Sequence, residues 1–286
     1  MISFVVLNYK NVDDTIECIK SIKSLHYNQE EISIIVVDNN TLHKDDVKRI
    51  KKYTKDIVLL KENIGFAKAN NKGSNYAIEK YNPDFLCVIN NDTVIYQKTF
   101  INEIYKAYKD TNFDIMGPKI ITNDGDSVNP FYAYEKIDEI NKKIAYSKKL
   151  IIIYKNRLLR FLLKIYLNIK HIFKKPTKML NGEKSKIGVA LHGCALIFSR
   201  KYYEKYEDVF YNDTFLYHEE EFLNYRKNRD NLITYYDSNL EIFHKEGSSL
   251  DLSFKGDTYN KLIFRNQEIV NSLTKLKDII ENNKEI

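Results

Sequence analysis

The chain has 286 residues, of which 43% are hydrophobic and 29% are charged, and its formal net charge is +6. This composition fits a folded domain with a sizeable core and excludes a disordered chain or a multi-span membrane protein. The excess of positive charge indicates an anionic partner, without distinguishing a nucleotide, a nucleic acid or a membrane surface.

Three cysteines, Cys18, Cys87 and Cys194, stand far apart in apolar surroundings. They show neither a metal-binding spacing nor a disulfide framework, which favours a reducing cytoplasmic compartment. Met1 runs directly into the apolar sequence ISFVVLNY, so we expect no signal peptide. No apolar run approaches the roughly 18 residues that a membrane-spanning helix needs.

The first 122 residues alternate between two patterns. Short apolar runs rich in Val and Ile predict buried strands, and they lie at 2–9, 32–40, 56–62, 84–90 and 113–122. Helical spacing predicts helices between them, the first over Ile16–Leu25 after a capping region at 11–13 and the others at 66–80 and 98–109. This alternation predicts an α/β fold with a mainly parallel sheet.

Polar clusters follow three of these strands, at Asn8-Tyr9, Asp38-Asn39-Asn40 and Asn90-Asn91-Asp92. Turn chemistry alone accounts for Asn and Asp at such positions. Ligands of parallel α/β sheets, however, bind outside the carboxyl ends of the strands. Because three clusters fall at three strand ends, we expect them at one edge of the sheet and favour a binding site over simple turns.

The segment 148–175 differs from its surroundings because it holds nine Lys or Arg residues and no Asp or Glu. Its polar residues recur at steps of three or four, which predicts one amphipathic helix with a wide apolar face. Such a helix suits an anionic membrane interface. A helix buried in the core or at a dimer interface, with its basic side chains reaching out from the rim, is the alternative.

The chain becomes globular again after residue 186. Residues 187–200 predict a strand and a bend in which Gly193 permits close backbone approach. The chain contains neither the dinucleotide-binding motif GxGxxG nor the phosphate-binding motif GxxxxGK[ST]. Their absence counts against nicotinamide oxidoreductases and P-loop phosphotransferases. Residues 257–284 have a loose helical periodicity, and no linker or repeat divides the chain.

Seven short motifs together resemble inverting family 2 glycosyltransferases. VVLNYKN, IIVVDNNT, ENIGFAKANNKG and VINNDT are similar to the nucleotide-sugar-binding half of these GT-A enzymes, and HGCALIFSR, FLYHEEEFLNYR and HKEGSS to their acceptor side. The similarity spans roughly residues 1 to 250 and is closest to bacterial rhamnosyltransferases and capsule or O-antigen sugar transferases. It implies a donor half at 1–122, an acceptor and catalytic half at 123–256 and a C-terminal helix at 257–286.

The resemblance also implies which residues bind the donor and a divalent metal ion. The donor-binding positions are Asn8, Tyr9, Asp38, Asn40, Asn63, Gly65, Asn91 and Asp92. Asn90-Asn91-Asp92 stands where the family has an Asp-x-Asp metal motif, so one carboxylate remains. Asp92 and His244 are the implied ligands for Mn²⁺ or Mg²⁺, and an imidazole favours Mn²⁺.

On the acceptor side, the acidic cluster Glu219-Glu220-Glu221 is also what a helix N-terminus favours. Arg226 follows Glu219 by seven residues, as an Arg does in the family, and this spacing aligns Glu220 with the catalytic base. Glu219 then positions the acceptor or the base. The remaining implied acceptor-side residues are His192, Gly193, His218 and Arg226.

The expected function is therefore transfer of a sugar from a UDP-hexose or dTDP-rhamnose to a glycan acceptor in bacterial surface polysaccharide synthesis. The acceptor is expected to be linked to a lipid such as undecaprenyl diphosphate, with the enzyme cytoplasmic and peripheral on the inner face of the membrane through 148–175. We expect no nucleic-acid partner, and a homodimer is a further expectation. A nucleotidyltransferase is less favoured because NYKNVDDT lacks a Gly-rich loop with Arg and Lys. A catalytically impaired scaffold or glycan-binding protein of the same fold is the non-enzymatic alternative.

Overall fold

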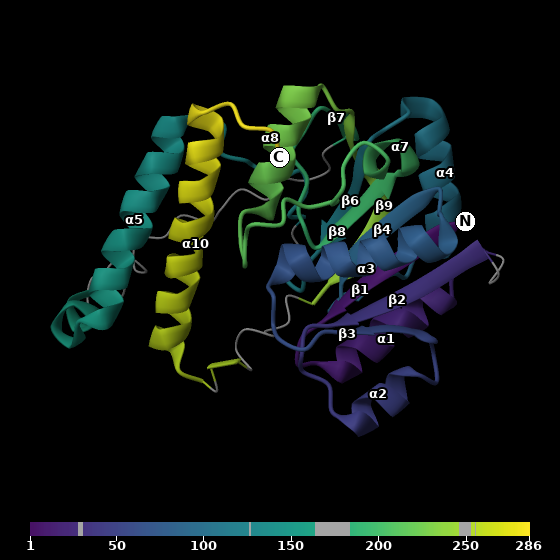
Figure 1. The fold of residues 1–286 in the computed structure, drawn as a ribbon, viewed down its shortest axis with the longest axis horizontal. Helices are drawn as coiled ribbons and strands as arrows, with labels where there is room; N and C mark the ends of the chain where they lie inside the picture. The colour runs from purple at the N-terminus through teal and green to yellow at the C-terminus, as the bar shows by residue number, and fades with distance from the viewer. Residues whose placement is uncertain (28–30, 126, 164–183, 246–252, 255) are drawn as a thin grey trace.

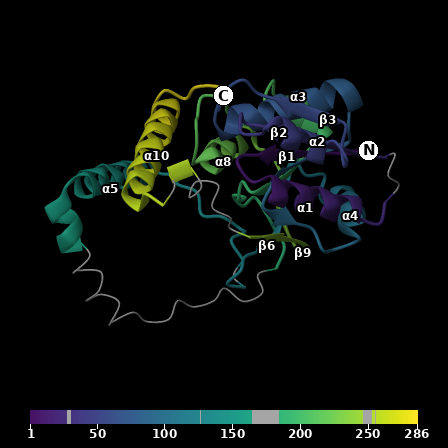
Figure 2. The ribbon, with the colours of Figure 1, turned by 90° about the horizontal axis from the view of Figure 1, so that it is seen from below.

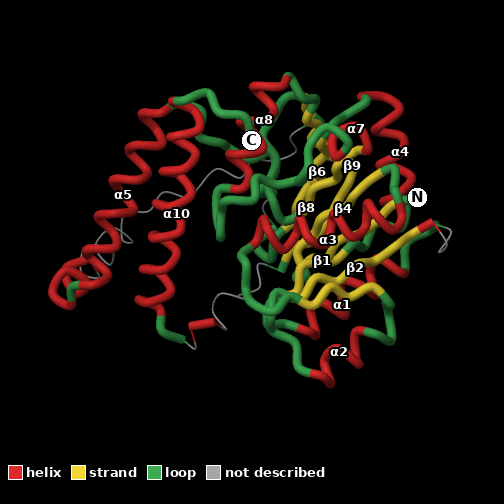
Figure 3. Tube along the Cα trace, viewed as in Figure 1, coloured by secondary structure: helices red, strands yellow, loops and turns green. Residues whose placement is uncertain are grey.

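A central sheet of nine strands organises the computed structural model, which describes residues 1–27, 31–125, 127–163, 184–245, 253–254 and 256–286 (Figures 1 and 3). The strand order is β3-β2-β1-β4-β8-β6-β9-β5, and β7 pairs with β9. The strands are β1 (Ile2–Asn8), β2 (Ile32–Asp38), β3 (Asp56–Leu59), β4 (Phe85–Asn90), β5 (Thr93–Val94), β6 (Ile115–Ile121), β7 (Lys186–Ile187), β8 (Ala195–Ser199) and β9 (Thr234–His244).

The sheet is mixed rather than mainly parallel. Strands β1 to β4 pair in parallel, as the alternation predicts. The neighbour of β4 on the other side is β8, which comes from much later in the chain and runs antiparallel to both β4 and β6. Strand β6 pairs in parallel with β9. The sheet therefore joins strands from the first 122 residues with strands from much later in the chain.

The helices are α1 (Val12–Lys23), α2 (Lys44–Ile50), α3 (Phe66–Tyr81), α4 (Phe100–Thr111), α5 (Ile137–Lys155), α7 (Arg200–Tyr203), α8 (Glu219–Asp230) and α10 (Thr258–Glu281). The three helices predicted in the first half are present, and α1 begins after Asn11, whose side chain accepts a hydrogen bond from the amide of Asp14. Helix α2 was not predicted. It buries only Ile50, so its sequence carries almost no apolar periodicity.

Alternating residues of the strands feed two apolar cores on the two faces of the sheet. Phe4 and Val6 join the core beneath α1 and α4, whereas Val5 and Leu7 join the core beneath α3. Figure 2 shows α3 on one face of the sheet and α1 with α4 on the other. This two-sided cover explains why the strands read as continuous apolar runs.

Helices α5 and α10 form a separate layer beside the sheet (Figure 1). Apolar side chains of both helices meet Phe222 of α8 in a third core cluster. The layer is thereby attached to the helix that carries the acidic cluster. The predicted C-terminal helix at 257–286 is α10, which ends at Glu281.

The basic segment 148–175 does not form one helix over its described part. Helix α5 already begins at Ile137, and it ends at Lys155. The side chain of Asn156 then accepts hydrogen bonds from the amides of Leu158 and Leu159, which starts a second helical stretch at 157–163. Residues 164–175 lie outside the described residues. Over the part of the chain that the structure describes, no helix is long and apolar enough to cross a membrane.

Candidate active site

The three polar clusters that follow β1, β2 and β4 do meet at one edge of the sheet. Asn8 lies opposite Asp38 in the β1–β2 pairing, and Leu7 lies opposite Asn90 in the β1–β4 pairing. The carboxyl ends of these neighbouring parallel strands are therefore level. The prediction that the three clusters lie at one edge of the sheet is confirmed.

A cavity of about 500 Å³ opens at this edge, within the size range of small-molecule sites. Its polar lining includes Tyr9, Asn39, Asn63 and Asp92. Its aromatic lining comes from the start of α3, from the chain before α8, and from α10 and the residues just before it. Its residues are Phe66, Phe215, Tyr217, Phe254 and Phe264.

Two residues that were expected to bind the nucleotide, Asn8 and Asp38, instead make hydrogen bonds within the protein. The Asp38 carboxylate accepts hydrogen bonds from the Asn8 side chain, from the Thr41 amide and hydroxyl, and from the Leu42 amide. Asn8 is fully buried and also accepts from the Thr15 hydroxyl. Neither residue lines the cavity, so both shape the loop that follows β2. Asn40 is exposed and does not line the cavity either.

Asn39, which motif alignment did not single out, lies at the cavity instead. Its amide group donates to the Asn63 side chain at 2.8 Å and to the Gly65 carbonyl at 3.2 Å, and its oxygen accepts from the Ile64 amide. Asn39 thus fixes the loop that carries two predicted donor-binding residues. The sequence did contain a signal for this residue, because Asn39 is the middle member of the polar cluster after β2.

Gly65 closes the cavity against the chain that leads into α8. It has φ of +89°, and a Cβ atom there would lie 2.3 Å from the carbonyl oxygen of Phe215. The next amide, that of Phe66, donates to the same oxygen at 2.8 Å. Only glycine permits this approach, because it combines a left-handed conformation with the absence of a side chain.

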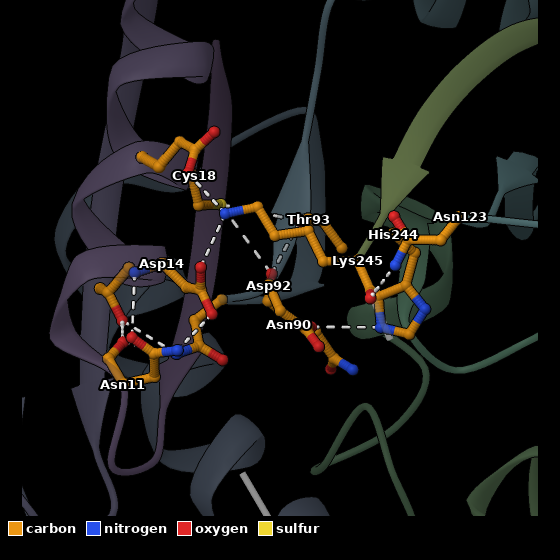
Figure 4. A network of polar contacts seen from close by, with 12 residues as sticks. Asn11, Asp14, Cys18, Asn90, Asp92, Thr93, Asn123, His244 and Lys245 are labelled. Atoms are coloured by element: carbon orange, nitrogen blue, oxygen red, sulfur yellow. Dashed lines mark hydrogen bonds and ion pairs between the residues drawn. The ribbon is translucent and has the colours of Figure 1, made fainter. Parts of the chain in front are cut away.

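Asp92 lines the cavity, and its side chain contacts that of His244 (Figure 4). Oδ1 of Asp92 lies 3.1 Å from Nε2 of His244, and both side chains are largely buried. Strand pairing enforces the contact, because Thr93 lies opposite His244. The next residue, Lys245, donates its amide proton to the Asp92 carbonyl and pairs through Nζ with Asp14 and Glu17.

One carboxylate and one imidazole suit a divalent cation that takes its other ligands from a bound diphosphate. Among the described residues, no three His, Cys, Asp or Glu side chains are placed to share a metal ion. Asn90 lines the cavity where the family motif has an acid. The Asn91 side chain donates to the Asn11 carbonyl and the Thr15 hydroxyl, so its amide nitrogen supports the fold.

Glu220 stands at the start of α8, where a turn from another part of the chain meets it. Its Oε1 atom accepts a hydrogen bond from the Gly193 amide at 3.0 Å. A Cβ atom on Gly193 would lie 2.9 Å from that oxygen, so glycine permits the contact. The adjacent His192 ring lies 6.5 Å, centre to centre, from the ring of His244. The turn 192–194 therefore connects the predicted base with the predicted metal corner.

The two neighbours of Glu220 are buried. Burial raises the pKa of Glu219 to about 8, and the charges of Glu220 and Glu221 add to the rise. Burial also raises the pKa of Glu221, whose carboxylate lies 2.9 Å from Nδ1 of His218. At neutral pH Glu219 therefore holds its proton.

Arg226 points away from the cavity. Its guanidinium donates to the Tyr202 hydroxyl and to the carbonyls of Asp208, Val209 and Ile286. The side chain is 4% exposed. The structure thus separates Arg226 from the acceptor-side residues with which the motif groups it, and its contacts anchor α8 to the chain on either side.

Comparison with known proteins agrees with this architecture. The model of Glycosyl transferase family 2 matches residues 3–207, which is more than half of the chain. The protein therefore belongs to glycosyl transferase family 2, and its fold is GT-A.

The similar proteins include a low-salt glycan biosynthesis hexosyltransferase, Agl10, from Haloferax volcanii. It is 28% identical over 136 residues, which cover 45% of this chain and 39% of the relative. The match thus spans less than half of the relative's length.

Two solved structures share the fold. TarS of S. aureus has a TM-score of 0.53 at 13% identity, covering 88% of this chain and 38% of TarS. A mannosyltransferase from Pyrobaculum calidifontis, PcManGT, in complex with GDP-Man and Mn²⁺, has a TM-score of 0.52 at 10% identity, covering 100% of this chain and 76% of its own.

Proposed function

We propose that this protein is an inverting glycosyltransferase that moves a sugar from a nucleoside diphosphate to a hydroxyl group of a glycan acceptor. One observation carries the proposal. The turn 192–194 holds the Glu220 carboxylate through the Gly193 amide and brings His192 within 6.5 Å of His244, whose partner Asp92 lines the donor-sized cavity. This chain of contacts links a carboxylate to a cavity that could hold a diphosphate, and a direct displacement requires both.

Inversion is a single in-line displacement in which the acceptor hydroxyl loses its proton as it attacks. Glu220 is the group proposed to take that proton. The N-terminus of α8 favours the negative charge of its carboxylate. Glu219 holds a proton at neutral pH, so it adds no second negative charge beside the base. Adjacent carboxyl groups can thus take different roles because their surroundings differ: Glu219 stays neutral, and Glu220 is the proposed base.

Asp92 and His244 are the proposed ligands of a divalent cation. When bound, such a cation would balance the charge that develops on the departing diphosphate. Mn²⁺ fits a mixed oxygen and nitrogen ligand pair, and the GDP-Man complex of PcManGT contains this ion.

The proposed acceptor is a lipid-linked glycan of a surface polysaccharide. Exposed apolar side chains gather on the second half of α5 and on 157–163, namely Ile152, Leu158, Phe161 and Leu162. Basic residues alternate with them along the same stretch of chain, at Lys148, Lys149, Lys155, Arg157 and Arg160. We call these nine residues the basic apolar face, and its chemistry suits an anionic lipid surface. The basic apolar face is distinct from the buried side of α5, where Ile140 and Ile144 pack with apolar residues of α10.

A donor screen tests the proposal. Thermal unfolding is followed with UDP-, GDP- and dTDP-sugars, each with and without Mn²⁺, and release of the free nucleotide is measured in parallel. We expect one nucleotide class to raise the unfolding temperature and to be hydrolysed slowly, with a larger effect when Mn²⁺ is present. The Asp92→Ala variant should lose the Mn²⁺-dependent part. If no donor stabilises the protein and none is hydrolysed, the scaffold or glycan-binding alternative is correct.

A further inference from the structure

The extended segment Phe131–Tyr134 runs beside the turn that holds the proposed base and does not line the donor cavity. The Phe131 amide donates to the Ala190 carbonyl at 2.9 Å, which joins the segment to the chain just before His192. Asn129 reinforces the junction. Its side-chain oxygen accepts from the His192 amide at 2.7 Å, and its nitrogen donates to the Pro118 carbonyl at 2.8 Å. Asn129 is 3% exposed, so this connection is buried and fixed.

Ring contacts link the segment to both parts of the chain that hold Glu220. At one end, the Phe131 ring meets the His192 ring edge-on, with centres 6.1 Å apart. At the other end, the Tyr134 ring lies 6.0 Å from the ring of His218. His192 precedes the glycine whose amide binds Glu220, and His218 lies two residues before Glu220 in the chain. The segment therefore contacts both the turn that binds Glu220 and the start of the helix that carries it.

Tyr132, between these contacts, is 70% exposed. Its ring is nevertheless held in place. The hydroxyl donates to Oε1 of Glu139 on α5 at 3.1 Å, and the ring stands perpendicular to that of Tyr134 with centres 6.2 Å apart. Single exposed aromatic residues are common on protein surfaces. What distinguishes Tyr132 is that a positioned ring remains open to solvent on a segment that contacts both the turn and the helix start that hold the proposed base.

A positioned tyrosine offers a flat apolar face at little cost in conformational entropy. The C–H face of a pyranose is apolar, whereas its hydroxyl groups project sideways, so a sugar ring can cover an aromatic face without losing the hydration of its hydroxyls. We propose that Phe131–Tyr134 is the acceptor platform, with Tyr132 packing against a pyranose ring of the glycan acceptor. This inference rests on the proposed function and assigns the acceptor side of the same site.

The absence of tryptophan from the chain permits a direct test. Tyr132→Trp introduces a single fluorescent reporter at the platform. Tyr96→Trp is the matched control, because Tyr96 is 67% exposed and contacts Phe243 outside the segment. Both variants are titrated with methyl glycosides and disaccharides of glucose, galactose, mannose, N-acetylglucosamine and rhamnose. We expect a saturable change in emission from Tyr132→Trp with at least one sugar, and none from Tyr96→Trp. If the two variants respond alike to every sugar, the platform does not exist.

A second measurement uses the sugar that gives the largest response as the acceptor in transfer assays. Tyr132→Ala should raise its KM by about tenfold, whereas Tyr132→Phe, which keeps the ring and loses the bond to Glu139, should restore the wild-type value. An unchanged KM for Tyr132→Ala would overturn the inference. Nucleoside diphosphate binding, measured on the same variants by calorimetry, separates the two claims. If the nucleotide binds and the platform fails, only this inference falls; if the wild-type protein binds no nucleotide, the proposed function fails.

Discussion

Glu219 shows how one buried side chain couples the stability of the protein to pH. Its pKa rises from the ordinary 4.5 of a glutamate to about 8, chiefly because the carboxyl group is buried and secondarily because Glu220 is charged. Between these two pH values the folded protein binds the proton and the unfolded chain does not. The free energy of unfolding should therefore fall as the pH rises from 4.5 to 8, by up to about 1.4 kcal/mol per pH unit.

Replacing Glu219 by Gln should remove this part of the pH dependence and stabilise the protein at the alkaline end. Urea denaturation at about pH 5 and about pH 8 measures the difference. Part of the slope should persist, because burial also raises the pKa of Glu221. Glu204→Gln, at an exposed position after α7, is the control and should leave the slope unchanged. Equal slopes for wild type and Glu219→Gln would show that the carboxyl group is not the cause.

Gly65 gives a second prediction at this scale. Gly65→Ala places a Cβ atom 2.3 Å from the Phe215 carbonyl in a left-handed backbone, so the loop must move away from the chain before α8. We expect a loss of about 1 to 3 kcal/mol in stability and weaker nucleoside diphosphate binding, measured by calorimetry. Gly125→Ala is matched, because φ is +78° there and nothing lies within 4 Å of the new atom. Equal nucleotide affinity in the two variants would contradict the closing role of Gly65.

At the scale of elements, the sequence predicts what depends on local pattern. Strands β1, β2 and β4 and helices α1, α3 and α4 follow from apolar runs and helical periodicity. The position of β8 does not, because its place between β4 and β6 is set by pairing with strands that are distant in the chain. The end of α5 at Lys155 depends on a single side chain, that of Asn156, which caps the next turn.

The basic apolar face makes a prediction at the same scale. We expect the protein to co-sediment with vesicles that contain phosphatidylglycerol at low salt, and less so at high salt, because exposed charges are screened. Phe161→Glu should weaken sedimentation, since it places a negative charge among exposed apolar groups. Ile187→Glu is the control, because Ile187 on β7 is 62% exposed and Phe161 is 61% exposed. If both variants sediment as the wild type does, the face does not bind lipid.

For the whole molecule, the site is assembled from segments that are distant in sequence. The ends of β1, β2 and β4 were predicted to meet because parallel strands share an edge. The roles of individual side chains were not predictable. Asp38 and Arg226 match motifs, yet their polar groups make hydrogen bonds to other residues of the fold. Asn129 and Phe131 carry no motif, and only the tertiary structure brings them beside the turn 192–194.

The assignment of Glu220 as the base is the central claim, and a single comparison tests it most directly. Sugar transfer and nucleotide binding are measured side by side on the wild-type protein, Glu220→Gln and Glu220→Asp. We predict that Glu220→Gln lowers kcat for transfer by roughly 10² to 10⁴ with unchanged nucleotide affinity. Glu220→Asp, which keeps the carboxylate, should recover much of the rate. Transfer by Glu220→Gln at the wild-type rate would contradict the account.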